Sequence, residues 1–306
     1  MKKMMILFVA LVAAWCASCS KDDDGGKTPD DPVEEAGLIM KSEEQVIRLD
    51  LFSEISKITI DWGDGTVKEY EGEYQEASNA YRIYMTYKYS QNALHTIKIN
   101  ECTGLLYLEC RSNQLTSLNV SGCTDLLYLY CSSNQLPSLD VSGCPDLIRL
   151  DCSYNQLPSL DVSGCPDLQL LYCSSNRLPS LDVSGCPDLI RLDCYTNQLS
   201  SLDISGCSDL TQLACSLNQL SLLDVTGSPA LTNLFCDENQ LSSLDVSGCS
   251  DLKWLECNDN LFSASALNQI YTDLPTIDGK IRANSNPGYP ESDRSIATGK
   301  GWVFSE

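Results

Sequence analysis

The chain has 306 residues, of which 43% are hydrophobic, so a large packed core is available. Twenty Lys and Arg residues against 42 Asp and Glu residues give a formal net charge of −22. A surface this acidic repels phosphate groups, which excludes nucleic-acid binding and disfavours direct docking on anionic lipid. The sequence contains 1 histidine, so any site that requires two histidines is excluded.

The N-terminus resembles the signal of a bacterial lipoprotein. Two lysines precede an apolar run over residues 4–17, which is shorter than the ~20 residues of a membrane span and is typical of a secretory signal peptide. The run ends in Cys16, Ala, Ser and Cys19, which is similar to a lipobox except that Cys16 stands where Leu is usual. The resemblance implies a signal peptide over residues 1–18 and lipidation of Cys19. An ordinary signal peptide cut nearby is the alternative.

An acidic segment follows the predicted lipidation site. Its Lys-Asp-Asp-Asp cluster at residues 21–24 resembles the export signal of some Gram-negative surface lipoproteins, and a solvated charge run is the alternative. Residues 19–36 lack periodicity and are rich in Asp, Gly, Pro and Lys, which predicts a flexible tether. Acyl chains contribute about 0.8 kcal/mol per buried CH₂, so they hold an acidic body at a membrane without further contact. We therefore expect a lipid-anchored protein exposed on the outer membrane.

Residues 37–100 predict a small N-terminal β cap. Apolar and polar residues alternate over 45–51, 57–62 and 81–89, as they do in half-buried strands. The sequence Trp-Gly-Asp-Gly-Thr at residues 62–66 carries an Asp-Gly hairpin signal. It resembles the turn of polycystic-kidney-disease-type β-sandwich modules, although the span is shorter than a complete module.

Three polar residues of this cap need an interpretation. Asp61 and Asp64 belong to the hairpin and are predicted to cap its turn, with cation binding as the alternative. His95 lies on the last predicted strand, without a second histidine or a cysteine nucleophile to act with, so we expect an ordinary surface residue.

From Leu105 the sequence repeats every 21 residues, with the consensus LxxLxCxxNxLxxLDVSGCxD. The consensus resembles the leucine-rich repeat of internalins and of Gram-negative surface lipoproteins, with Cys in place of the third Leu. The resemblance implies a β-rich leucine-rich-repeat solenoid over residues 101–262, built as a right-handed coil with a parallel concave sheet. The units begin at Leu105, Leu126, Leu147, Leu168, Leu189, Leu210, Leu231 and Leu252.

The residues of one unit predict the same coil on physical grounds. A short strand alternates its side chains, so leucine and cysteine point inward and the residues between them point outward. The few apolar side chains of one coil do not offset the ordering of 21 residues, so the coils must stack in order to fold. In the third unit the predicted inward residues are Leu147, Leu150, Cys152, Leu157, Leu160, Val162 and Cys165.

Asparagine and cysteine recur in columns. A neutral amide can both donate to and accept from backbone groups buried in a turn, so the asparagines are interpreted as structural. The cysteines are predicted to be small buried thiols, because column neighbours ~4.8 Å apart with parallel side chains do not suit a disulfide. A disulfide ladder is the alternative, and zinc is disfavoured because the repeats contain no CxxC pair and the chain has no second histidine. The asparagine column is Asn113, Asn134, Asn155, Asn176, Asn197, Asn218, Asn239 and Asn260.

Two aspartate columns place like charges ~4.8 Å apart. The repulsion between these carboxylates must be offset by other interactions. Hydrogen bonds from free backbone N–H groups in Asx turns would do so, and a row of calcium ions is the alternative. One column is Asp140, Asp161, Asp182, Asp203, Asp224 and Asp245. The other is Asp125, Asp146, Asp167, Asp188, Asp209 and Asp251.

Residues 263–306 predict an α/β C-terminal cap. Ser263 suits the N-cap of a helix whose apolar residues recur at helical spacing from Leu267 to Leu274. A strand at 280–284 and a short helix near 292–298 follow. An atypical terminal element is what the open end of a solenoid requires.

The positions that vary between units are the candidate binding site. On the predicted concave sheet they carry aromatic residues flanked by Arg and Asp, a composition typical of recognition surfaces. Tyr128, Tyr130 and Tyr172 are the expected anchors, and aromatic rings also stack on sugars. The predicted ligand-binding residues are Tyr107, Tyr128, Tyr130, Arg149, Asp151, Tyr172, Arg191, Asp193, Tyr195, Phe235 and Trp254.

Three classes of function compete for this sequence. We predict a non-enzymatic adhesion protein that binds a protein or glycan of a host or neighbouring cell, without a cofactor or a metal other than the calcium alternative. A structural envelope protein would use the same face only to stabilise the sheet, with Arg149 paired to Asp151 and Arg191 to Asp193. A glycosidase-like enzyme is the third class, but repeated aspartates belong to the scaffold and a short open solenoid rarely offers a desolvated pocket.

Overall fold

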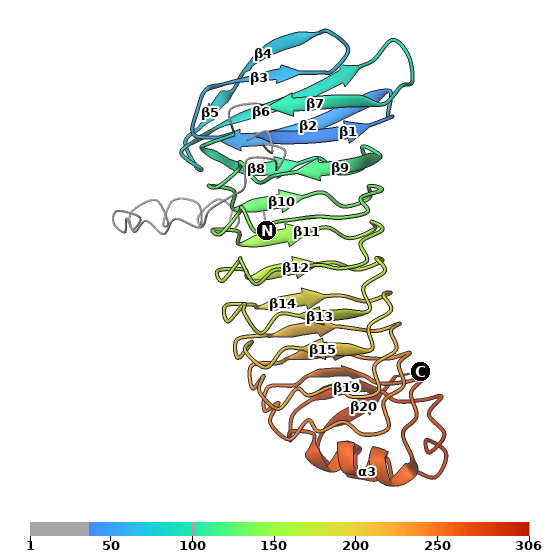
Figure 1. Ribbon diagram of the computed structural model, residues 1–306. Coiled ribbons are helices and arrows are strands. Elements are labelled where there is room, and N and C mark those ends of the chain that lie inside the picture. Colours follow the sequence, from blue (N-terminus) through green and yellow to red (C-terminus); the bar gives the residue numbers. More distant parts are fainter. Residues whose placement is uncertain (1–36, 100–101, 306) are drawn as a thin grey trace, which may run out of the picture.

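A computed structural model describes residues 37–99 and 102–305 of the chain. The predicted signal peptide, the tether and Cys19 therefore lie outside the described residues. Figure 1 shows a curved column of stacked coils, with a strand-rich cap at the N-terminal end and a helix beside the last coils. The predicted fold class, a leucine-rich-repeat solenoid with a parallel sheet, is confirmed.

The N-terminal cap is built from antiparallel strands that continue directly into the solenoid. Its strands are β1 (Leu38–Ser42), β2 (Val46–Ser53), β3 (Lys57–Asp61), β4 (Val67–Glu71), β5 (Glu73–Gln75), β6 (Ala80–Lys88) and β7 (His95–Ile99). The first coil contributes β8 (Leu105–Glu109) and β9 (Leu115–Asn119). Strand β2 pairs with β8, and β1 pairs with β9, both antiparallel. The cap therefore holds the first coil along two edges.

The hairpin of the cap is closed by its two aspartates, as expected. Oδ1 of Asp61 accepts a hydrogen bond from the N–H of Gly63 at 2.9 Å, and Oδ1 of Asp64 accepts one from Thr66 at 3.0 Å. His95, in contrast, is not the ordinary surface residue that was expected. It is half-buried and its ring stacks on that of Tyr89, with 3.7 Å between the centroids.

The coils contribute one short parallel strand each to a single long sheet. The side-chain alternation within each strand buries leucine and leaves its two neighbours outward, as in Arg149, Leu150 and Asp151. The strands are β10 (Tyr128–Tyr130), β11 (Arg149–Asp151), β12 (Leu170–Tyr172), β14 (Arg191–Asp193), β16 (Gln212–Ala214), β17 (Asn233–Phe235) and β18 (Trp254–Glu256). Outside this sheet, β13 (Ser180–Asp182) and β15 (Ser201–Asp203) form a separate two-stranded parallel sheet.

The C-terminal cap prolongs the long sheet. Two further parallel strands, β19 (Gly279–Arg282) and β20 (Trp302–Phe304), follow β18 at the end of the sheet. Helix α3 (Ala264–Asp273) begins after Ser263, whose Oγ accepts a hydrogen bond from the N–H of Ala266 at 3.2 Å. Its buried side chains are Leu267, Ile270 and Tyr271, and α4 (Ser295–Thr298) is a single turn. No helix of residues 37–99 or 102–305 is long and apolar enough to cross a membrane.

The core consists of the repeated apolar columns. All seven side chains predicted to point inward in the third unit are buried. The cysteines of the described chain are free thiols in this core, without a disulfide between them. Burial raises the pKa of the Cys110 thiol to about 12 and that of Cys152 well above its ordinary value.

The asparagine column links each coil to the one before it. The Nδ2 group of Asn155 donates to the carbonyl of Cys152 in its own coil at 3.0 Å and to that of Cys131 in the preceding coil at 3.1 Å. Its Oδ1 accepts from the N–H of Leu136 in the preceding coil at 3.0 Å. The predicted structural role is thus confirmed, and each amide satisfies backbone groups that the turn leaves unpaired.

Asparagine side chains also link the first and last coils to the two caps. At the first coil, Asn113 accepts from the N–H of Arg48 on β2 at 2.9 Å and donates to its carbonyl at 2.8 Å. Beyond the last repeat, Asn286 donates to the carbonyl of Cys257 at 3.0 Å and accepts from the N–H of Phe262 at 3.2 Å. Asn286 stands outside the sequence repeat, so its place in the column was not predicted.

The residue before each of these asparagines has a left-handed backbone. In the first coil, Gln114, which follows Asn113, has a left-handed backbone as well. Only glycine and, less readily, asparagine adopt it without strain. None of these residues is glycine, and their side chains have no common type, which explains why the sequence did not reveal the feature. They are Ser112, Ser133, Tyr154, Ser175, Thr196, Leu217, Glu238, Asp259 and Ser285.

The two aspartate columns differ. In the first, each Oδ1 accepts from the N–H two residues on, as Asp161 does from Ser163 at 2.9 Å, and these hydrogen bonds lower the pKa of Asp161. The Asx turns predicted for this column are confirmed. In the second, Asp125 instead accepts from the N–H of Gly104 in the preceding coil at 2.8 Å. The other members of that column are exposed and make no such turn, so the prediction was wrong for them.

Candidate functional site

The variable residues of the long sheet share one surface, which we call the ladder face. Parallel pairing in register places Tyr128 beside Tyr107 and Arg149, and Tyr130 beside Glu109 and Asp151. The ladder face consists of Tyr107, Glu109, Arg111, Tyr128, Tyr130, Arg149, Asp151, Tyr172, Arg191, Asp193 and Tyr195. It covers the first five coils of the solenoid.

Arginine and tyrosine alternate along the ladder face. The guanidinium of Arg111 lies 4.4 Å from the ring centroid of Tyr130, and that of Arg149 lies 4.9 Å from the same ring. Arg149 also lies 4.6 Å from the ring of Tyr172, which Arg191 approaches to 5.2 Å. Because the arginines come from the coils before and after each tyrosine, both faces of these two rings are covered.

Ion pairs fix two of the three arginines. Nη2 of Arg111 lies 2.7 Å from Oδ2 of Asp151, two coils away, and Nη1 lies 3.9 Å from Oε1 of Glu109. Nη2 of Arg191 lies 2.8 Å from Oδ2 of Asp193 in its own strand. The expected pairing within one strand is therefore present at Arg191. It is absent between Arg149 and Asp151, because the carboxylate of Asp151 forms its ion pair with Arg111.

The tyrosines are less exposed than their sequence positions suggested. Tyr130 is 5% exposed, and Tyr107, Tyr128 and Tyr172 are half-buried. Burial raises the pKa of Tyr107, Tyr128 and Tyr130, so these hydroxyls remain protonated hydrogen-bond donors in neutral solution. One such donor is used internally, since the Tyr107 hydroxyl donates to Oε2 of Glu109 at 2.6 Å.

The N-terminal cap adds residues to this surface that the sequence did not identify. The ring of Phe52 on β2 meets that of Tyr107 edge-on, with 5.2 Å between the centroids. Arg82 lies 5.7 Å from the Phe52 ring and is paired to Asp50 at 2.6 Å. Strand β2 joins the long sheet antiparallel to β8, and nothing in the repeat predicts that contact.

Two of the predicted residues lie apart from this stack. Phe235 and Trp254 form an edge-on pair with 5.4 Å between their centroids, near the C-terminal end of the sheet. Trp254 is 39% exposed, and Lys280 of the C-terminal cap lies 5.5 Å from its ring. The coil of β16, with Gln212 and Ala214 outward, separates this pair from the ladder face. Tyr195 is half-buried, and a hydrogen bond with Tyr154 raises its pKa.

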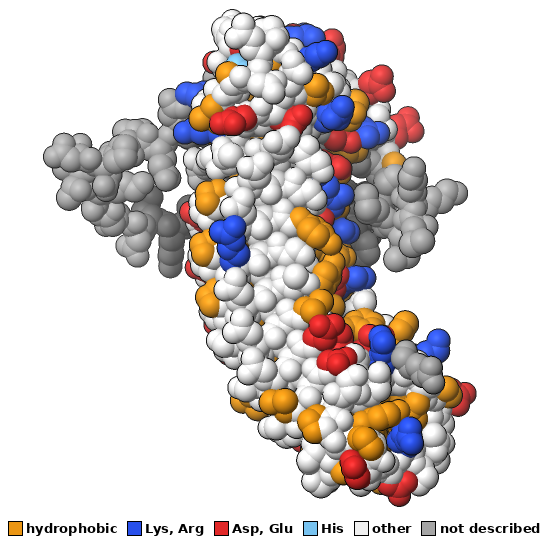
Figure 2. All heavy atoms as spheres, turned by 90° about the vertical axis from the view of Figure 1, so that its right-hand side faces the viewer, with side chains coloured by type: hydrophobic (Ala, Val, Ile, Leu, Met, Phe, Trp, Pro, Cys, Tyr) orange, Lys and Arg blue, Asp and Glu red, His pale blue; other side chains and the backbone are white. Residues whose placement is uncertain are grey.

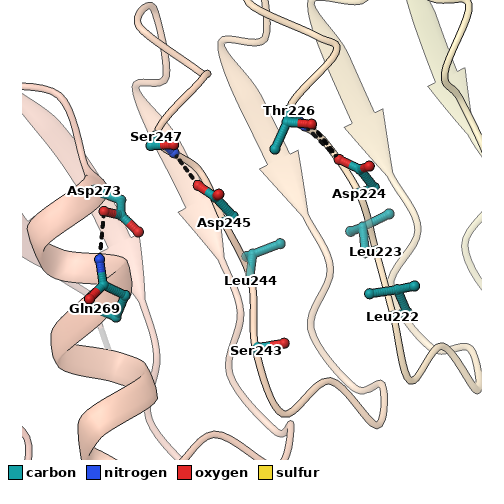
Figure 3. Close-up of a pocket in the computed structure, with 10 residues that line it drawn as sticks. All are labelled: Leu222, Leu223, Asp224, Thr226, Ser243, Leu244, Asp245, Ser247, Gln269 and Asp273. Carbon is teal, nitrogen blue, oxygen red and sulfur yellow. Dashed lines mark hydrogen bonds between the residues drawn. The ribbon is translucent and has the colours of Figure 1, made fainter.

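A groove of about 660 Å³ lies between two late coils and α3. Figure 3 shows its leucines and its acidic side chains. Leu222 is 69% exposed there, whereas the carboxylates are engaged by their own elements. Asp224 accepts from the N–H of Thr226 at 2.9 Å, Asp245 from Ser247 at 2.9 Å, and Asp273 from the Gln269 amide at 2.8 Å. Hydrogen bonding lowers the pKa of Asp224 and Asp245, so neither carboxyl group is suited to act as a general acid near neutral pH.

Figure 2 shows the side of the column that lies to the right in Figure 1. Charged side chains are most frequent at its two ends and along one edge, while a central strip of uncharged side chains and backbone is flanked by hydrophobic side chains. Within the described part of the chain, no group of three or more His, Cys, Asp or Glu residues could hold a metal ion.

Comparisons with solved structures identify proteins of similar fold. No protein-family model and no curated protein sequence matches the chain. Among solved structures, the functional domain of InlJ from Listeria monocytogenes, described as including a cysteine ladder, aligns with a TM-score of 0.55 and 31% identity. The alignment covers 68% of this chain and 50% of that one, so the chain spans half the length of the InlJ structure.

The internalin InlF of the same organism aligns with a TM-score of 0.53 and 22% identity, over 61% of this chain and 56% of that one. At this identity the likeness concerns the fold alone. The chain is a leucine-rich-repeat solenoid whose fold is similar to that of internalins.

Proposed function

We propose that this chain is a cell-surface binding protein that recognises a protein partner through the ladder face. The observation that carries the proposal is the contrast within each unit. Residues of the core and turns repeat almost unchanged, while the ladder face varies from coil to coil and collects stacked arginine and tyrosine. These two residue types are enriched at the centres of protein interfaces. The internalin-like fold supports a role in protein binding or adhesion.

The covering of the tyrosine rings favours a protein over a glycan. A sugar ring stacks on an open aromatic face, and both faces of Tyr130 and Tyr172 are occupied by guanidinium groups. The ladder face offers instead the edges of these groups, with hydroxyl and guanidinium donors. Such donors suit the carbonyls and carboxylates of a polypeptide.

The proposal also includes a lipid anchor and a location on the cell surface. Lipidation of Cys19, followed by the acidic segment, would hold the chain on the outer membrane of a Gram-negative cell, with the solenoid outside. The partner would then belong to a host or a neighbouring cell. A binding role is preferred to catalysis because the groove near α3 combines leucine side chains with carboxylates that are held in turns. The hydroxyl of Thr226 donates to Asp224, but the hydrogen bonds that lower the pKa of Asp224 and Asp245 make these carboxylates weak bases.

The test is an array of extracellular-matrix proteins, envelope proteins and glycans, probed with the full chain purified in detergent. The variant Tyr128→Ala, Tyr130→Ala, Tyr172→Ala is compared with the control Arg177→Gln, which changes an exposed arginine away from the ladder face. We expect a protein on the array to bind, and the triple variant to weaken that binding by about tenfold or more while the control does not. Absence of any ligand, or a ligand that the triple variant retains, would contradict the proposal. Circular dichroism melting checks that both variants fold.

A further inference from the structure

Arg149 differs from the other two arginines of the ladder face. Arg111 and Arg191 each contact a carboxylate within 3 Å, whereas Arg149 forms no ion pair with any described residue. Its Nε is fully buried and has no hydrogen-bond partner. The Nε of Arg111 is also unpartnered, but the charge of Arg111 is already neutralised through its Nη atoms.

The carboxylate on the same strand as Arg149 does not form an ion pair with it. Asp151 lies two residues away on the same strand, yet its Oδ2 accepts from Nη2 of Arg111 at 2.7 Å and from Oγ of Ser132 at 3.4 Å. Its Oδ1 accepts from the N–H of Ser153 at 3.3 Å. Both oxygens of Asp151 are thus engaged, and a positive charge is left at Arg149.

The rings of Tyr130 and Tyr172 hold this charge in place. The guanidinium of Arg149 lies between them, at 4.9 and 4.6 Å from their centroids. A guanidinium stacked between two rings has its flat faces covered, and because Nε of Arg149 is buried, the two Nη groups are left to donate. The edge formed by the two Nη groups matches the two oxygens of a carboxylate. Preorganisation by the rings reduces the entropy lost when such a ligand binds.

We infer that Arg149 is the subsite for a side-chain carboxylate of the protein partner. The inference rests on the proposed function and adds the chemistry of one anchor point. General electrostatic attraction does not explain such binding, because the chain has a net charge of −22 and repels acidic molecules at long range. The contact with an Asp or Glu side chain is therefore local, and it depends on the one ladder arginine that has no counter-ion among the described residues.

A peptide is preferred to an acidic glycan as the source of the carboxylate. A uronic acid would bring its sugar ring against Tyr130 and Tyr172, whose faces are already covered by arginine. An Asp or Glu side chain is narrow and reaches the guanidinium edge from an extended backbone. A response to polygalacturonate serves as the competing outcome in the experiment below.

The experiment uses arrayed short random-sequence peptides, each present also in a version with Asp and Glu replaced by Asn and Gln. The full chain, Arg149→Gln, Arg149→Lys and the control Arg177→Gln are applied, with polygalacturonate as a separate probe. We expect the full chain to bind acidic peptides about tenfold or more tightly than their amide versions. Arg149→Gln should abolish that preference, Arg149→Lys should keep part of it because the charge remains, and Arg177→Gln should keep all of it.

The outcomes separate this inference from the proposed function. If peptides bind equally well in acid and amide form, the carboxylate subsite is wrong while protein binding stands. If polygalacturonate binds in an Arg149-dependent way and peptides do not, the source of the carboxylate is wrong. If neither probe binds although the protein array gives a ligand, the subsite is again wrong. If nothing binds in either experiment, both proposals fail. Melting curves of the two Arg149 variants exclude misfolding as the cause.

Discussion

Each coil joins two regions that obey different constraints. The core and turn region repeats the same leucine, cysteine, asparagine and aspartate positions, and its polar groups are satisfied within the solenoid. The ladder face changes at every coil, and it leaves Arg149 without an ion-pair partner in the described chain. The difference teaches that repetition in this sequence marks groups needed for stacking, whereas variation marks the surface that is free to acquire a specific chemistry. Four predictions test the distinction.

The largest effect is expected from alkaline pH, which acts on the repeated thiols. Burial raises the pKa of Cys110, Cys215 and Cys257 from 9.0 to about 12. Below pH 9 these thiols are protonated in both the folded and unfolded states, so their contribution to stability is complete. Above pH 9 the unfolded state ionises first, and the free energy of unfolding falls by about 1.4 kcal/mol per thiol for each pH unit until pH nears 12.

Because many such thiols act together, we expect cooperative unfolding between about pH 9 and pH 11. Urea unfolding at a series of pH values measures it. Replacing Cys110, Cys215 and Cys257 by Ala should make the decline shallower. Stability that is constant through pH 10 would show that the cysteines are not buried thiols in the native protein.

The second prediction removes one member of the asparagine column. Asn155→Ala leaves the buried N–H of Leu136 without its partner. The carbonyls of Cys131 and Cys152 each lose one donor but keep another, from Asn134 and Asn176. The unsatisfied N–H costs about 1–3 kcal/mol and each lost hydrogen bond about 0.5–1 kcal/mol, so the free energy of unfolding should fall by about 2–4 kcal/mol. Chemical denaturation measures the loss. Gln156→Ala, at the adjacent exposed position, is the control and should change stability by less than about 0.5 kcal/mol.

The third prediction turns to the ladder face. Tyr172→Leu keeps apolar bulk but removes the ring between Arg149 and Arg191. Two cation–π contacts at a half-buried site contribute about 1–2 kcal/mol, so the variant should lose that amount and remain folded. Thermal unfolding measures it. A loss as large as that of Asn155→Ala would mean that the ladder face is part of the scaffold, and would remove the distinction between the two regions.

The smallest effect is a gain at the strained position before an asparagine. Leu217 is exposed and has φ of 57°, which costs a non-glycine residue about 1–2 kcal/mol. Leu217→Gly relieves that strain and loses about 0.5–1 kcal/mol in chain entropy, for a net gain of about 0.5 kcal/mol. Gln219→Gly, which lacks a positive φ, is the matched control and should only destabilise. Equal destabilisation in both variants would argue against the left-handed turn.

Periodicity explains why the solenoid was predictable. The inward residues, the asparagine bonds and the Asx turns of one aspartate column follow from a coil that repeats, because each neighbour presents the same groups. The pairing of Arg111 with Asp151 did not follow, since it spans two coils and depends on the tyrosine between them. Phe52 was missed for a related reason: the cap strand reaches the sheet through antiparallel pairing that no local pattern encodes.

The asparagine bonds at the two ends of the solenoid have a consequence for its evolution. Asn286 bonds to the last repeat in the way that an internal asparagine bonds to its neighbouring coil. Asn113 instead directs its bonds to Arg48 of the cap, and only the first coil pairs with cap strands. The coils between the two junctions are therefore interchangeable, whereas the first coil belongs with its cap. Adding or deleting one internal coil leaves both junctions unchanged, so the length of the solenoid can change in single-coil steps while the ladder residues vary independently.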